Sequence, residues 1–174
     1  MFIQLILMVT GAILGALFSA FLPLAAAILK IRRKKKFLGV WKSRYQNEFL
    51  PRGNWIDEDV EVVAKQGSLV FRNVKNPVGS KYIAYGRLES HDSEIEGQWH
   101  EAEEGAHACG SFHLFVHPMG NILYGLCSGI TDTGERLYTG WVLARKEEDL
   151  AKAHQLLRGA DLLLASSSRE SGDV

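Results

Sequence analysis

Aromatic and arginine side chains lie close together along much of this 174-residue chain. A nucleic-acid base stacks on a flat ring, gaining about 1–3 kcal/mol, and a phosphate binds a cation. We select Arg44, Arg72 and Arg87 as candidate phosphate ligands, with Tyr45 and Trp99 as candidate stacking platforms. The alternative is structural, because alternate aromatic residues commonly fill a core and exposed arginines commonly keep a protein soluble. The wider set also contains Trp41, Trp55, Tyr82, Tyr85, Tyr124, Tyr138, Trp141 and Arg136.

Motifs typical of enzymes do not occur in the sequence. It has no Gly-x-Ser-x-Gly elbow, Walker loop, Rossmann glycine set or His-Glu-x-x-His. The acidic run Asp57–Asp59 comes just before an expected strand, and we interpret it as a solvated turn. We therefore expect no enzymatic activity, no catalytic residue and no cofactor.

Six histidines are the natural candidates for metal ligands. His113 and His117 share a strand face, but four residues separate them by about 13 Å, too far to hold one ion. The polar segment His100–His107 contains three glutamates, but a loop with Gly and Ala does not fix a metal geometry. We interpret it as a solvated acidic loop and expect no metal site. A haem held by a single histidine stays open.

The two cysteines, Cys109 and Cys127, are too few for a disulfide framework. We expect them on neighbouring strands, not directly opposed, reduced, and serving as small apolar fillers.

The segment Phe2–Leu29 contains no charged side chain, and Lys30–Lys36 contains six basic residues. The first is long enough to cross the roughly 30 Å hydrocarbon core as a helix. Basic residues beside a span stay in the cytoplasm, so we expect the N-terminus outside and the rest of the chain inside. A cleaved signal peptide would carry its charge before a shorter apolar run.

The basic collar leaves an acidic remainder. It holds six of the 20 Lys and Arg residues, so Phe37–Val174 holds 14 against all 20 acidic residues, a net charge of −6. General nucleic-acid binding needs a basic face, so DNA and RNA are not expected partners. The collar itself suits anionic lipid headgroups, and the bilayer is an expected partner.

Small residues recur every four positions in the expected span, at Gly11, Gly15 and Ser19, with a second stripe at Ala12, Ala16 and Ala20. Such stripes let two helix backbones approach closely in lipid. They predict self-association and a homo-oligomer.

Period-two patterning replaces the helical pattern after the collar, which predicts an all-β domain. No helical segment separates the strands, and the connections are short, which favours an eight-stranded antiparallel up-and-down barrel over a sandwich. We expect a helix after Glu147, ending near Gly159 or Ala165, and a disordered tail at 166–174. The domains are then 1–29 (transmembrane helix), 30–36 (collar) and 37–165 (barrel and helix). The expected strands are Gly39–Gln46, Asp59–Lys65, Leu69–Val74, Lys81–Ser90, Glu94–His100, Cys109–His117, Ile122–Gly129 and Arg136–Arg145.

The sequence Gly39-Val40-Trp41 opens the first strand, and Arg145 closes the last. This resembles the calycin group of lipocalin- and avidin-type barrels. The resemblance implies structural roles for Trp41 and Arg145, with the guanidinium packed on the indole across the closed end of the barrel. It implies no activity.

The whole architecture resembles the transmembrane β-barrel effectors of bacterial cyclic-oligonucleotide anti-phage systems. That resemblance implies a barrel that binds a cyclic dinucleotide, oligomerises and disrupts the inner membrane. The chain departs from the pattern because relatives are typified by two spans and the 28 uncharged residues Phe2–Leu29 cross only once. Two alternatives stay open: a constitutive membrane-tethered lipocalin-like barrel for an apolar small molecule or protein partner, and a structural subunit with a filled lumen.

Overall fold

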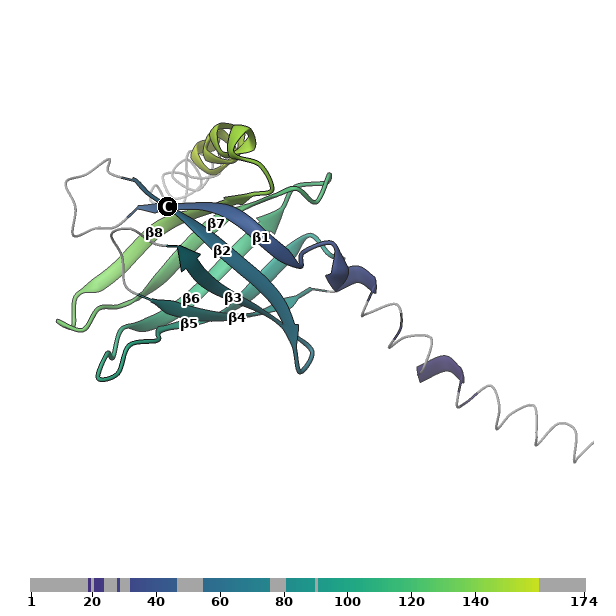
Figure 1. Ribbon diagram of the computed structural model, residues 1–174, viewed down its shortest axis with the longest axis horizontal. Helices are drawn as coiled ribbons and strands as arrows, with labels where there is room; N and C mark the ends of the chain where they lie inside the picture. The colour runs from purple at the N-terminus through teal and green to yellow at the C-terminus, as the bar shows by residue number, and fades with distance from the viewer. Residues whose placement is uncertain are drawn as a thin grey trace, which may run out of the picture. The chain divides into compact units, whose positions relative to one another are not determined.

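A computed structural model describes residues 19, 21–23, 28, 32–46, 55–75, 81–89 and 91–159. The chain divides into two compact units, Met1–Lys36 and Phe37–Val174. The second unit carries the sheet (Figure 1).

Eight antiparallel strands form a closed barrel in which every strand pairs with its neighbours in chain order. The ring closes where Lys42–Tyr45 of the first strand pairs with Trp141–Ala144 of the last (Figure 1). The expected all-β, eight-stranded up-and-down barrel is therefore confirmed. The strands are β1 (Gly39–Gln46), β2 (Trp55–Lys65), β3 (Ser68–Lys75), β4 (Tyr82–Leu88), β5 (Glu94–Glu101), β6 (Cys109–Val116), β7 (Ile122–Ile130) and β8 (Arg136–Ala144).

The largest departure from the expected boundaries is in β2. This strand begins at Trp55, so the run Asp57–Asp59 lies inside it and the solvated-turn interpretation was wrong. Alternation puts Asp57 and Asp59 on the outer face and Glu58 on the inner face, where its side chain is buried.

The hairpin between β2 and β3 is a two-residue turn at Gln66 and Gly67. Both have positive φ, 48° and 84° respectively, as a type I′ turn requires.

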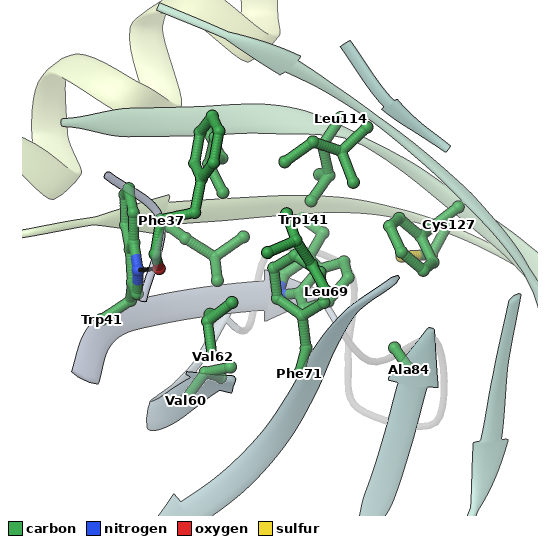
Figure 2. Packing of buried hydrophobic residues seen from close by; sticks show 14 residues of the cluster. Phe37, Trp41, Val60, Val62, Leu69, Phe71, Ala84, Leu114, Cys127 and Trp141 are labelled. Atoms are coloured by element: carbon green, nitrogen blue, oxygen red, sulfur yellow. Dashed lines mark hydrogen bonds between the residues drawn. The ribbon is translucent and has the colours of Figure 1, made fainter. Parts of the chain in front are cut away.

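Apolar side chains of the inner faces fill the space between the strands (Figure 2). Phe71, Phe112 and Trp141 meet edge to face, with ring centroids 5.4–5.7 Å apart. These contacts add to the area that the rings bury. The same cluster contains Phe37, Trp41, Val60, Val62, Leu69, Ala84, Ile95, Leu114, Leu123, Cys127 and Leu143.

The closed end of the barrel has the arrangement that the calycin resemblance implied. Arg145 lies over the Trp41 ring, 4.1 Å from its centroid. The Trp41 indole nitrogen donates a hydrogen bond to the Phe37 carbonyl at 2.7 Å, drawn in Figure 2. An eight-stranded closed barrel with a C-terminal helix is consistent with a calycin-like barrel.

A short 3₁₀ turn, Glu147–Asp149, leads from β8 into a helix at 150–159. Leu150, Ala153 and Leu157 of this helix pack on the outer face of β7 and β8, against Ile122 and Val142 (Figure 1). The expected C-terminal helix is thus confirmed through residue 159. The expected tail at 166–174 lies outside the described residues.

Within the first unit, residues 32–35 are helical and Ser19 is helical and exposed. Gly11 and Gly15 lie outside the described residues, so the small-residue stripe stays a prediction. No helix formed by the described residues combines the length and apolarity needed to cross a bilayer.

Candidate functional site

Five side chains form one cross-strand row on the outer face of β4–β8. Tyr85 pairs with Gln98, Gln98 with Ser111, Ser111 with Ser128, and Ser128 with Tyr138. Tyr85 and Tyr138, at the two ends, are 42% and 59% exposed. Large rings at the ends and small polar groups between them make a trough, which we call the outer groove.

Glycines thin the sheet beneath this groove. A side chain at Gly97 would meet the Phe112 ring at 2.7 Å, and one at Gly110 would meet the Trp99 indole at the same distance. The two rings therefore cover bare backbone from the inside, an arrangement that compensates for glycine in strands. The resulting concavity measures about 1220 Å³.

The groove offers stacking, hydrogen-bonding and charged groups together. The His100 ring stacks on Tyr85, with centroids 5.9 Å apart and planes 12° from parallel. Arg87, an exposed residue of β4, also lines the groove, and no described residue hydrogen-bonds or ion-pairs with it. Its guanidinium is therefore available to an anionic ligand.

Arg44 and Arg72 lie elsewhere on the outer face and are already paired. Arg44 holds Asp57 through two hydrogen bonds of 2.5 and 3.0 Å, and Arg72 holds Glu61 at 3.0 Å. With Lys42–Asp59 at 2.7 Å, these pairs form a ladder between β2 and its neighbours. A ligand that used Arg44 or Arg72 would have to displace a carboxylate.

Tyr45 and Trp99, selected as stacking platforms, point inward and pack against the core. The Trp99 indole nitrogen donates a hydrogen bond to the Ser128 carbonyl at 3.2 Å. The sheet thus separates the Tyr45 ring from the arginines of the outer face. Of the five selected residues, only Arg87 and Trp99 line the same concavity.

A buried carboxyl on the inner face of β2 was missed from the sequence. Glu58 is 5% exposed and accepts hydrogen bonds on Oε1 from the Tyr82 hydroxyl at 2.5 Å and the Ser43 hydroxyl at 3.2 Å. The Trp141 indole in turn donates to the Ser43 oxygen at 2.9 Å. The sequence does contain a signal for this burial, because Glu58 alternates with the apolar residues Ile56 and Val60, as residues on one face of a strand do.

Burial raises the pKa of Glu58 to about 7, more than the hydrogen bonds from Tyr82 and Ser43 lower it. Burial likewise raises the pKa of Tyr82 and of the Cys127 thiol, and the Glu58 charge adds to both. The cluster can bind and release a proton near neutral pH inside an otherwise apolar lumen.

The cysteines lie on neighbouring strands and are not opposed, as expected. Cys109 faces Ile130 and Cys127 faces Phe112 across the β6–β7 pair. Cys127 is buried as an apolar filler, but Cys109 is exposed, so that interpretation was wrong for Cys109. It sits on the outer face and lines the groove.

Strand register also brings together three groups of the kind that bind metals. Glu94, Glu96 and His113 each place a ligand atom within 4.8 Å of the other two. Sequence reasoning missed this cluster because its members come from two strands.

Comparison with known proteins finds no family model that matches this chain. No curated protein matches its sequence either.

Proposed function

We propose that this chain is a membrane-anchored, non-enzymatic sensor-effector. Its barrel faces the cytoplasm, binds a cyclic dinucleotide in the outer groove, and self-associates so that the clustered spans disrupt the inner membrane in anti-phage defence. The observation that carries the proposal is a groove that combines exposed aromatic rings with the cation of Arg87, which pairs with none of the described residues.

The groove suits a flat, two-base ligand in its size and in its stacking and hydrogen-bonding groups, with Arg87 as the cation for a phosphate. Its 1220 Å³ slightly exceeds the roughly 300–1,000 Å³ of ordinary small-molecule sites. Tyr85 and Tyr138 lie at the two ends of the row, on β4 and β8, and each exposed ring can stack on a base. Arg87 can fork onto a phosphate. Gln98, Ser111 and Ser128 supply hydrogen-bonding groups between them.

The amino-acid sequence supports the proposed membrane span, its orientation and its self-association. The uncharged segment Phe2–Leu29 and the basic collar support a single span with the N-terminus outside. The stripe at Gly11, Gly15 and Ser19 supports association of spans. A ligand promotes clustering only by binding the clustered state more tightly than the single chain.

The alternative of a lipocalin-like barrel for an apolar small molecule needs internal room. The packed cluster that includes Phe71, Phe112 and Trp141 occupies the inner faces, so the outer groove is the better-supported site. A protein partner is a second candidate, favoured by the exposed Phe115 and Ile130 on the same outer face.

The test is titration calorimetry of the full-length protein in detergent against a panel of cyclic dinucleotides, with light scattering for mass. We expect saturable heat with at least one member of the panel and a rise in mass on binding. The matching linear dinucleotide is the control for shape. Heat from none of the panel, with unchanged mass, would refute the proposal.

A further inference from the structure

Two carboxylates and one imidazole meet on the outer face of β5 and β6. Glu94 and Glu96 are two residues apart on β5, and His113 lies directly opposite Glu96 on β6. His113 Nε2 is 3.1 Å from Glu94 Oε2 and 3.9 Å from Glu96 Oε1. One ring nitrogen therefore faces both acids.

These separations match three ligands around one small ion. Zinc binds histidine nitrogen and carboxylate oxygen at about 2.0–2.2 Å, so neighbouring tetrahedral ligands lie roughly 3.3–3.6 Å apart. The two measured distances lie on either side of that value. All three ligand atoms lie within 4.8 Å of one another, and rotation of the exposed carboxylate side chains would bring them to tetrahedral spacing.

The backbone holds the three groups in place. β5 and β6 are interior strands of the closed barrel, each paired on both sides. The His113 ring also rests against Phe115, with centroids 4.7 Å apart. The three side chains are 38–57% exposed, so an ion could arrive from solvent and keep a water ligand.

Neighbouring charges leave the acids available. Arg87 is opposite Glu96 on β4 but forms no ion pair with it in the part of the chain that the structure describes. There, both glutamates form their ion pairs with His113 alone. Two carboxylates and one imidazole present a mixed oxygen and nitrogen donor set.

We propose that Glu94, Glu96 and His113 form a binding site for one divalent first-row transition-metal ion, with zinc as the natural occupant. The imidazole favours zinc over magnesium and calcium, which prefer all-oxygen sites. The site does not depend on the proposed function, although Glu96 and His113 also line the outer groove. A bound ion would add positive charge beside Arg87.

The test is calorimetry of untagged, full-length protein in detergent titrated with zinc chloride, and with cobalt(II) followed by visible absorption. The wild type should bind one ion with tetrahedral cobalt bands. Loss of a direct ligand should weaken binding by at least the roughly 10–100-fold seen when a residue that merely orients a ligand is removed. His113→Ala, Glu94→Gln and Glu96→Gln should all show this loss.

Two matched variants serve as controls. His117→Ala removes a histidine just beyond β6, and Glu61→Gln removes a glutamate that pairs with Arg72. Both should bind zinc like the wild type, and circular dichroism should show every variant folded. If His113→Ala misfolds, the two glutamine variants decide the question. No binding by the wild type, or equal binding by the ligand and control variants, would overturn the site while leaving nucleotide binding untouched.

Discussion

The guanidinium of Arg145 lies 4.1 Å from the centroid of the Trp41 ring and donates a 2.9 Å hydrogen bond to the Leu38 carbonyl. Arg145 directly follows β8, whereas Leu38 and Trp41 flank the start of β1. The seam between these strands has only four residue pairs in register. Partial burial lowers the pKa of Arg145, but the cation–π contact and the carbonyl bond favour the charged side chain.

Arg145→Ala should therefore weaken the seam. We expect a loss of about 2 kcal/mol in the free energy of unfolding, from one cation–π contact and one charge-assisted hydrogen bond. Arg145→Lys should recover only part of this, because an ammonium lacks the planar fork. The control is Arg136→Ala at the exposed start of β8, which should stay within about 0.5 kcal/mol of the wild type in urea unfolding.

Glu58 should make stability fall as pH rises. Its pKa is about 7 in the fold and near 4.5 when the chain is unfolded. Between these values the folded protein holds a proton that the unfolded chain has released. The contribution of this proton to the free energy of unfolding is on the order of 3 kcal/mol. It is fully present below about pH 4.5 and is lost as the pH rises through 7.

Glu58→Gln removes this titration but keeps an oxygen that can accept from Tyr82. The variant should be more stable than the wild type at pH 8 and should have a flatter stability profile between pH 4.5 and 8, measured by urea unfolding at each pH. Glu61→Gln, on the outer face of β2, is the control and should keep the wild-type slope. Parallel profiles for the wild type and Glu58→Gln would contradict the buried-carboxyl account.

Trp99 should contribute to the stability of the barrel whether or not a ligand is bound. Its indole covers Gly110 and Gly129 from inside the barrel and bonds to the Ser128 carbonyl. Trp99→Ala should cost about 3 kcal/mol, as removal of a packed aromatic ring does. Tyr85→Ala, which removes an exposed ring from the outer groove, should cost under about 1 kcal/mol. Similar losses for the two in thermal or urea unfolding would argue against an inward, structural Trp99.

The two thiols should react at very different rates. Cys109 is exposed on β6, whereas Cys127 is buried and burial raises its pKa. The native protein should release one equivalent of thionitrobenzoate with Ellman's reagent, and the denatured protein two. Cys109→Ser should abolish the native reaction, and a fast-reacting thiol in that variant would contradict the inward placement of Cys127.

The barrel could be predicted from sequence because its strands are short, alternating and separated by clear turns. Gln66-Gly67 illustrates this, since a left-handed pair between two alternating runs specifies a tight hairpin. Trp41 and Arg145 could be placed together because the first and last strands of a closed meander must be neighbours.

The candidate sites were harder to predict than the barrel. They depend on which face of the sheet each side chain occupies and on the register between neighbouring strands. The three consecutive acids Asp57–Asp59 resemble a turn in the sequence. Only the alternation of Glu58 with the apolar residues Ile56 and Val60 reveals that its side chain points inward. Tyr45 and Arg44 are adjacent in sequence and so face opposite sides of the sheet. Which residue of β5 lies opposite His113 depends on the exact length of the hairpin between the two strands.

The most direct test of the proposed ligand site compares Arg87→Ala with Arg44→Ala in cyclic-dinucleotide binding. Both variants remove an outer-face arginine, but only Arg87 lines the groove, while Arg44 is bound to Asp57 on another part of the barrel. Calorimetry of the full-length protein should show at least about tenfold weaker binding for Arg87→Ala, equivalent to the loss of one charged hydrogen bond, and wild-type affinity for Arg44→Ala. Equal affinities, or a loss confined to Arg44→Ala, would contradict the outer groove as the binding site.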